Sequence, residues 1–186
     1  MITPLSPRAA ETWQLLANRA ATERDPRLRA NLTVVARHVE AEVRGDIPAL
    51  MATLVAEPRY QVWGASASVG PQGYDEVANF YQAAIRIGKN RLEFEIVRVM
   101  VDRDTVLTEG TFRHAYSGAM LTARGYDTVE DDPTGWYLVE YQALIVWPIS
   151  RDGLIVGEDM YAGEAPRIVR RLDTGELDHL GPVDRG

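Results

Sequence analysis

The chain contains no cysteine among its 186 residues. This absence excludes disulfides, thiolate nucleophiles and cysteine-ligated zinc or iron–sulfur sites. The sequence also has no apolar run near the length of a membrane span, and its N-terminus lacks the apolar region of a secretory signal. We therefore expect a soluble cytoplasmic protein that does not contact a membrane.

Positive charge and histidine are scarce as well. The 20 lysines and arginines are outnumbered by 27 aspartates and glutamates, which gives a net charge of −7. This balance argues against nucleic acid and anionic membranes as partners. His38, His114 and His179 lie far apart in the sequence, so we expect no metal site.

The apolar pattern changes halfway along the chain. Helical spacing dominates the first half and predicts helices over 6–22, 29–44, 47–54 and 73–87, the first capped by Ser6 and broken at Pro26. A period of two then predicts strands over 91–101, 105–117, 136–147 and 154–161, with a shorter earlier strand at 60–64. Helices followed by antiparallel strands indicate an α+β fold in which the helices pack on one face of a curved sheet. We expect the tail after Pro166 to wrap the surface or fray.

The last hairpin contains two adjacent acids, Glu158 and Asp159, whose side chains must point to opposite faces of the strand. A two-residue turn in its loop pairs Trp147 with Glu158. A three-residue loop with left-handed Gly153 instead pairs Ile145 with Asp159. The longer loop gathers the aromatic residues on one face and leaves Glu158 with other polar residues, so it predicts that Asp159 faces the core.

The predicted inner face supplies candidate site residues. Asp159 is the candidate acid or base, because an aromatic pocket favours a carboxyl group whose pKa suits proton transfer. His38 or His114 is its candidate partner. The candidate wall of the pocket is aromatic and consists of Tyr60, Trp63, Tyr81, Phe112, Tyr116, Tyr141, Trp147 and Tyr161.

Four segments together resemble a known family. "VVARHVEAEVRGDIPALMATL", "GYDEVANFYQ", "TVLTEGTF" and "GLIVGEDMYAG" are similar, in order and spacing, to the SnoaL-like branch of the nuclear transport factor 2-like superfamily. The resemblance covers roughly residues 30–163. It implies a cone-shaped α+β barrel, with a strongly curved antiparallel sheet wrapped around N-terminal helices and a deep apolar pocket. It also implies a dimer without metal or organic cofactor.

Individual family positions match this sequence unevenly. His38 stands where ketosteroid isomerases carry a tyrosine, and Val62 stands where they carry the basic aspartate. Gly110 and Phe112 replace an arginine and an aspartate of the epoxide hydrolases, whose third polar residue matches Asp159. The polyketide cyclases in the family use an acid and a histidine in an apolar pocket, a pattern that Asp159 with His38 or His114 fits.

These observations predict a cofactor-independent acid–base enzyme of the cyclase, dehydratase or isomerase type. Its ligand would be a small to medium apolar carbonyl or hydroxyl compound. The alternatives are a binding protein of the same fold without chemistry, and a dimerisation module. We expect a helical extension over 1–28, a SnoaL-like barrel over 29–165 and a tail over 166–186. We also expect a homodimer through the outer sheet face, where Val97, Val99 and Val101 would form an exposed row.

Overall fold

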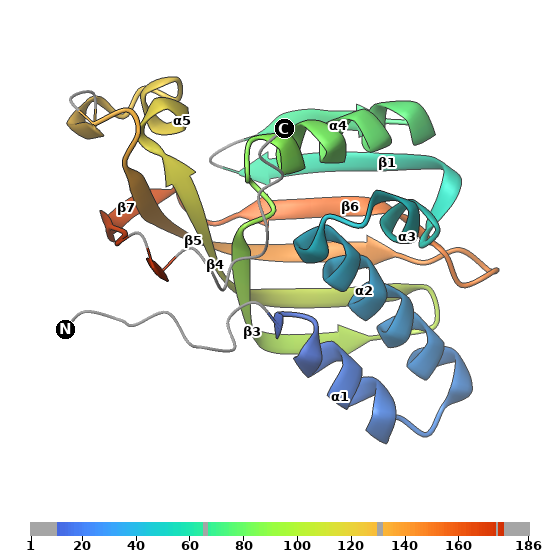
Figure 1. Ribbon diagram of the computed structural model, residues 1–186. Helices are drawn as coiled ribbons and strands as arrows, with labels where there is room; N and C mark the ends of the chain where they lie inside the picture. The colour runs from blue at the N-terminus through green and yellow to red at the C-terminus, as the bar shows by residue number, and fades with distance from the viewer. Residues whose placement is uncertain (1–10, 65–66, 130–131, 174, 177–186) are drawn as a thin grey trace.

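The computed structural model describes residues 11–64, 67–129, 132–173 and 175–176. Its first four helices are α1 (Gln14–Thr22), α2 (Pro26–Arg44), α3 (Ile47–Met51) and α4 (Tyr74–Arg86). The strands are β1 (Leu54–Gly64), β2 (Ser68–Gln72), β3 (Leu92–Val101), β4 (Thr105–Ser117), β5 (Trp136–Pro148), β6 (Ile155–Ala162) and β7 (Arg167–Arg171). Helix α5 (Gly118–Thr122) and a 3-10 helix (Asp127–Val129) lie between β4 and β5. Figure 1 confirms the predicted α+β arrangement, with the helices lying against one face of a curved sheet. In the described part of the chain, no helix combines the length and the apolar character that a membrane span requires.

Helix α2 begins earlier than the sequence indicated. Pro26 was expected to break the first helix, and α1 does end before it, at Thr22; Pro26 itself occupies the first turn of α2, where its missing N–H is harmless. The Asp25 side chain caps this end and accepts hydrogen bonds from the backbone N–H of Arg27 (2.8 Å) and Leu28 (3.3 Å). Gly45, with φ of 70°, ends the helix as expected. The predicted start of the first helix at Ser6 lies outside the described residues.

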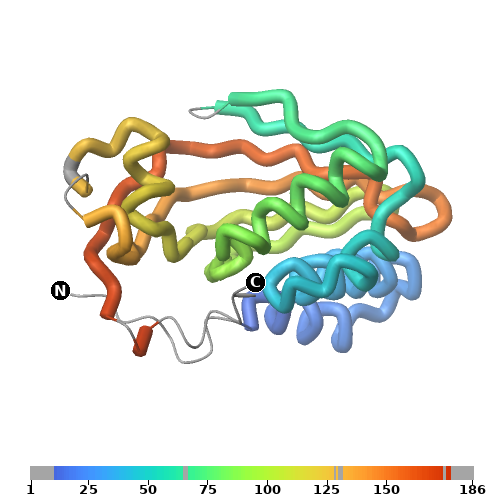
Figure 2. Tube along the Cα trace, turned by 45° about the horizontal axis from the view of Figure 1, so that its top comes forward, coloured from blue at the N-terminus to red at the C-terminus, as the bar shows by residue number. Residues whose placement is uncertain are grey.

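The sheet has seven strands in the order β2-β1-β6-β5-β4-β3, with β7 also pairing with β5 (Figure 2). β1 and β6 are parallel, and the other pairs are antiparallel. In the described chain β2 and β3 form open edges, so the curled sheet does not close into a full barrel. The tail expected to wrap or fray instead contributes β7, which pairs with the first half of β5 beside the end of β6.

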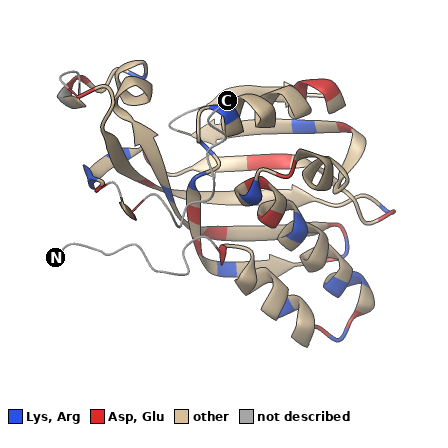
Figure 3. Ribbon diagram, viewed as in Figure 1, with Lys and Arg blue, Asp and Glu red and all other residues tan. Residues whose placement is uncertain are grey.

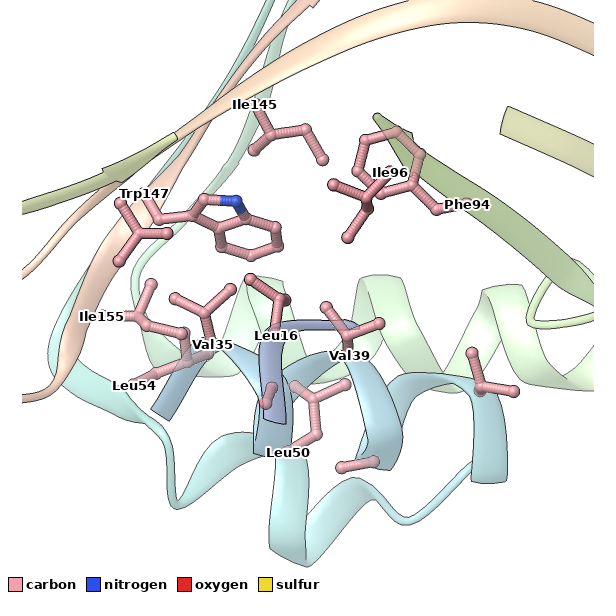
Figure 4. Close-up of a cluster of buried hydrophobic side chains, with 14 of the residues drawn as sticks. Leu16, Val35, Val39, Leu50, Leu54, Phe94, Ile96, Ile145, Trp147 and Ile155 are labelled. Atoms are coloured by element: carbon pink, nitrogen blue, oxygen red, sulfur yellow. The ribbon is translucent and has the colours of Figure 1, made fainter. Parts of the chain in front are cut away.

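The main core lies between the first three helices and the concave face of the sheet. Figure 4 shows Leu16, Val35, Val39 and Leu50 of the helices facing Phe94, Ile145, Trp147 and Ile155 of the strands. Val35 and Val39 lie one turn apart on α2 and therefore present one apolar face to the sheet. Burial of this face positions the polar residues that follow at the same spacing, His38 and Glu42, over the inner surface of the sheet.

The hairpin between β5 and β6 corrects the orientation predicted for its two acids. Gly153 has φ of 82°, and Ile149 pairs with Ile155, as the longer loop requires. Farther along, however, Val146 pairs with Asp159. β6 therefore spans four residue steps where β5 spans three, which is a β-bulge with one extra residue in β6. A shift of one residue exchanges the two faces of a strand, so Glu158 points inward. The prediction that Asp159 faces the core was therefore wrong.

Gly157 lies within this bulge, beside the parallel strand β1. A Cβ atom at this position would lie 1.7 Å from the Arg59 carbonyl oxygen, so any larger residue must displace the backbone. We expect Gly157→Ala to lower the free energy of unfolding by about 2 kcal/mol or more, because overpacking against main chain cannot be relieved by a side-chain rotation. Urea denaturation measures this effect. The matched substitution Gly163→Ala separates the clash from the general effect of replacing a glycine, because the nearest atom lies 3.8 Å from the added Cβ and neither glycine has a left-handed φ.

A second bulge changes the outer face of β3. The register shifts between Ile96 and Arg98, which leaves Val97 70% exposed. Val99 and Val101 then turn inward and pack against the core. The exposed row of three valines does not exist, because the bulge reverses the alternation after Val97. The expected homodimer stays a prediction and loses this row as its support.

Candidate active site

A cavity of about 240 Å³ lies between α2, α4 and the inner face of the sheet. Its apolar and aromatic lining comprises Val39, Tyr60, Val62, Phe80, Leu92, Phe94, Phe112, Tyr141, Ile145, Trp147 and Met160. Its ionisable polar lining comprises Glu42, Tyr81, Lys89, His114 and Glu158. An apolar cavity with a few converging polar groups is the usual form of a small-molecule site.

Three neighbouring strands build an aromatic wall of stacked rings on one side of the cavity. Phe94 of β3 and Phe112 of β4 are direct cross-strand partners, and their rings stack at 4.1 Å with an interplanar angle of 5°. Tyr141 of β5 pairs with Phe112 in turn, with ring centroids 5.5 Å apart and planes at 17°. His114 lies two residues along β4 and continues the stack at 5.5 Å. Because these rings lie face to face, the wall offers a row of ring edges to a ligand.

At the end of the cavity where Glu158 lies, four side chains form one hydrogen-bonded group: Glu158, Tyr81, His38 and Tyr60. The Tyr81 hydroxyl donates to Glu158 Oε1 at 2.8 Å. His38 Nε2 lies 3.1 Å from each of these two oxygen atoms. The Tyr60 hydroxyl is 3.1 Å from that of Tyr81, and it must donate to Tyr81, whose own proton is directed to Glu158. Figure 3 shows the acidic residues of β6 as a red band in the middle of the sheet.

The tautomer of His38 follows from its other neighbour. The Thr53 hydroxyl has one proton, which it donates to the Leu50 carbonyl oxygen at 2.6 Å. Thr53 Oγ1 is also 2.7 Å from His38 Nδ1 and must therefore accept a hydrogen bond from that nitrogen. His38 thus carries a proton on Nδ1, which fixes its ring and aims Nε2 at Glu158.

One further proton must lie between His38 and Glu158. If His38 were neutral and Glu158 ionised, lone pairs of Nε2 and Oε1 would face each other at 3.1 Å. The observed contact requires either an imidazolium that donates to a carboxylate, or a carboxylic acid that donates to a neutral imidazole. In both cases the pair has no net charge and holds one transferable proton beside the cavity.

Glu42 supplies a second carboxyl group. It lies one turn beyond His38 on α2 and also lines the cavity. Burial raises the pKa of Glu42 to about 8, and the negative charge of Glu158 acts in the same direction. At neutral pH Glu42 is therefore mainly a neutral carboxylic acid, which can donate a hydrogen bond to a ligand oxygen.

His114 lies at the other end of the cavity and differs from His38 in its surroundings. Its Nε2 is 3.1 Å from the Tyr141 hydroxyl, and the ring is buried within the aromatic wall. Burial lowers the pKa of His114 to about 3, and the positive charge of Lys89 adds to this effect. His114 is therefore neutral and acts as a wall and hydrogen-bonding residue rather than as a titrating partner of an acid.

The structure brings only some of the predicted site residues together. Five predicted wall residues line the cavity: Tyr60, Tyr81, Phe112, Tyr141 and Trp147. Trp63 and Tyr161 instead stack on each other at 6.2 Å, and each is almost half exposed. Tyr116 packs in a separate cluster with Leu121. Among the predicted catalytic residues, His38 contacts Glu158 behind the lining, His114 lines the cavity, and Asp159 lies outside it.

Three ionisable residues of the cavity were not predicted. Glu158 was assigned to the outer face by the wrong register. Glu42 lies four residues after His38, and this spacing, which places both on one helix face, was the signal that could have identified it. Lys89 follows Gly88 in a polar turn, and no sequence pattern marks its side chain as part of a cavity.

The order of elements and the position of this cavity define the cone-shaped fold of the nuclear transport factor 2-like superfamily. The SnoaL-like domain family matches residues 35–157, and the chain belongs to this family. No match was found among curated proteins.

Solved structures share the fold at low sequence identity. A protein named as a SnoaL-like polyketide cyclase from Jannaschia sp. CCS1 is 19% identical, with 76% of this chain and 90% of that chain covered and a TM-score of 0.58. A second such protein, from Shewanella putrefaciens CN-32, is 11% identical, with 79% and 86% covered and a TM-score of 0.60. An epoxide hydrolase from M. tuberculosis is 20% identical, with 74% and 85% covered and a TM-score of 0.52. At these identities the likeness shows the fold and leaves the reaction to the residues of the site.

Proposed function

We propose that this protein is a cofactor-independent acid–base enzyme of the cyclase, dehydratase or isomerase type. Its substrate would be a small, largely apolar compound with a carbonyl or hydroxyl group. The observation that carries this proposal is the 3.1 Å contact between His38 Nε2 and Glu158 Oε1 at the edge of an apolar cavity, from which the transferable proton is inferred. The names of solved cyclases and epoxide hydrolases of the same fold support this proposal, since they imply reactions at an oxygen-containing group of the substrate.

Proton balance assigns roles to the two members of the pair. Glu158 gives the shared proton to a substrate oxygen as negative charge develops there. The emptied carboxylate then takes a proton from a carbon or hydroxyl of the same substrate, which restores the pair. Without the shared proton, the Nε2 lone pair of His38 would face the Glu158 carboxylate, so the donation and the uptake of a proton must be closely coupled in time, while Thr53 holds the His38 ring in place. No proton is gained or lost overall, as cyclisation, dehydration and isomerisation require.

A neutral donor of the cavity holds the substrate oxygen. Burial raises the pKa of both Tyr60 and Tyr81 well above that of a free tyrosine, so both hydroxyls keep their protons at neutral pH. Tyr60 donates its proton to Tyr81, and Tyr81 donates to Glu158, so the donor left for the substrate oxygen is the protonated Glu42, which lines the cavity. Such a donor stabilises a developing oxyanion most strongly where water is excluded.

The exchange of hydrogen for deuterium next to a carbonyl group tests this proposal without knowledge of the natural substrate. We expect the wild-type protein to accelerate exchange of the methyl protons of acetophenone or 4-acetylbenzoate in D₂O, followed by NMR. Glu158→Gln keeps the size of the side chain but cannot accept a proton. We expect it to lower the exchange rate at least about a hundredfold, as is typical for loss of a general acid–base residue.

Asp159→Asn is the matched control, because it removes a carboxylate from the adjacent position on the opposite face of β6. We expect this variant to retain the wild-type exchange rate. Loss of activity in Asp159→Asn with retention in Glu158→Gln would refute the assignment. Binding of ketones without any acceleration of exchange would favour a non-catalytic binding protein.

A further inference from the structure

Lys89 is a cationic side chain of the cavity that the acid–base cycle does not use. It lies in the turn after α4, where Gly88 has φ of 75° and the Lys89 N–H donates to the Ala84 carbonyl at 2.8 Å. The next residue, Asn90, donates from Nδ2 to the Val43 carbonyl and ties the turn to α2. This anchoring directs the Lys89 side chain into the cavity, at the end near His114.

The Lys89 ammonium has no contacting counterion. Within the described ranges, no carboxylate lies within 4.0 Å of its nitrogen and no side-chain hydrogen bond is made to it. The ammonium lies 5.4 Å from the centroid of the Phe80 ring. Burial lowers the pKa of Lys89 and the nearby Arg124 adds to this effect, while Glu42 and Glu158 oppose it. An anion bound at this end would offset the effects of burial and of Arg124, both of which disfavour the charged form of Lys89.

The charges around the cavity do not cancel. The His38 and Glu158 pair with its shared proton is neutral, and Glu42 is mainly protonated at neutral pH. His114 is neutral because burial lowers its pKa to about 3. Among the described lining residues, the Lys89 ammonium is then the charge that lacks a counterion. The Lys89 ammonium is therefore the unbalanced charge of the cavity, which makes this end complementary to a monoanion.

The size and the lining of the cavity further limit the class of ligand that it can bind. Its volume of about 240 Å³ lies below the roughly 300–1,000 Å³ typical of pockets for drug-sized ligands. One side is the row of stacked rings of Phe94, Phe112, His114 and Tyr141, whose edges favour an edge-to-face contact with a planar ring of the ligand. A single ring fits these limits better than a fused polycyclic compound.

We propose that the ligand is a small planar carboxylate, with its anionic group on Lys89, its ring against the aromatic wall and its reacting oxygen near Glu158. The position of the reacting oxygen rests on the proposed function, whereas the carboxylate and ring sites do not. The substrate class is thus an aromatic or conjugated keto or hydroxy acid with one ring.

Calorimetric binding of two isosteric probes tests the carboxylate site. 4-Acetylbenzoate and 4-acetylbenzamide have the same shape and ketone but differ in charge. We expect the wild-type protein to bind the carboxylate at least tenfold more tightly than the amide. Lys89→Met should abolish this preference while it leaves the amide affinity unchanged, and Lys89→Arg should retain most of it. Arg86→Met, which removes an exposed cation from α4 outside the cavity, should behave as wild type.

The outcomes separate this proposal from the proposed function. Equal affinity of the wild-type protein for the two probes, or a preference that persists in Lys89→Met, would overturn the carboxylate site. Glu158→Gln should keep the preference, because binding of the anion does not require proton transfer. A protein that prefers the carboxylate but never accelerates exchange would retain the ligand assignment and lose the enzymatic one.

Discussion

Replacing Glu42 by Gln is expected to stabilise the protein at pH 8 by about 2–4 kcal/mol and to have little effect near pH 4.5. The folded protein holds the proton of Glu42 with a pKa of about 8, because burial and the charge of Glu158 disfavour the carboxylate. The unfolded chain releases this proton at the ordinary value of 4.5. Gln cannot ionise, so the variant has no difference in pKa between its folded and unfolded states at this position.

The sign follows from the raised pKa. Below pH 4.5 Glu42 is protonated in both states and does not affect the pH dependence. Between pH 4.5 and about 8 the unfolded chain gains free energy by ionising, and each pH unit lowers the stability of the folded protein by about 1.4 kcal/mol. Above that range both states are ionised and the loss is complete. Because Glu42 lines the cavity, we expect the total loss of stability to be smaller than this slope alone would give.

Urea denaturation of both proteins at pH 5 and pH 8 measures the effect. Glu40→Gln is the control, because Glu40 lies on the same helix but forms an exposed ion pair with Arg44 at 2.8 Å. Such pairs contribute about 0–1 kcal/mol, so this variant should show no comparable gain at pH 8. A stability difference between wild type and Glu42→Gln that is equal at both pH values would show that Glu42 is not held protonated.

Much of the fold could be predicted because its main elements bury one face each. In α2, apolar residues recur at helical spacing and place Val35 and Val39 on the core. In β4 and β5, alternation marks the inner faces that the structure confirms at Phe112 and Tyr141. The family resemblance, based on the order of these segments, is confirmed by the matching residues 35–157.

Short and irregular elements could not be predicted in the same way. β2 contains glycine and proline and pairs only with β1, so its sequence has no alternating pattern. β7 is five residues long and depends on the exposed edge of β5 for its hydrogen bonds. Pairing with a distant strand is a tertiary effect, which local sequence does not specify.

The orientation of the site depends on one inserted residue. The sequence correctly indicated a loop with left-handed Gly153, but it does not locate a bulge farther along β6. The bulge accommodates Gly157 where β6 passes the Arg59 carbonyl, and that contact joins residues from separate parts of the chain. The identity of the inward acid was therefore decided by packing between strands. The altered pKa values of Glu42 and His114 likewise arise from burial that only the folded chain creates.

His114 is expected to make the protein sensitive to acid. Its pKa is about 3 in the folded protein, because burial disfavours the imidazolium and Lys89 repels it, whereas the unfolded chain binds the proton near 6.5. A lowered folded pKa gives stability that is fully present above pH 6.5 and is lost as the pH falls toward 3. Between pH 7 and pH 4 this residue should account for about 3 kcal/mol of lost stability.

Two substitutions isolate this effect from the titration of carboxylates. His114→Phe keeps a stacking ring but leaves the Tyr141 hydroxyl without its partner, whereas His114→Gln keeps a polar partner and loses the ring. Their stabilities at pH 7 should differ, yet both should lose about 3 kcal/mol less than wild type between pH 7 and pH 4. NMR titration of the wild-type imidazole should show no protonation of His114 above pH 4 in the folded state. A folded-state titration near pH 6.5, or variants with the acid sensitivity of wild type, would show that this histidine exchanges protons freely and is not a buried neutral part of the aromatic wall.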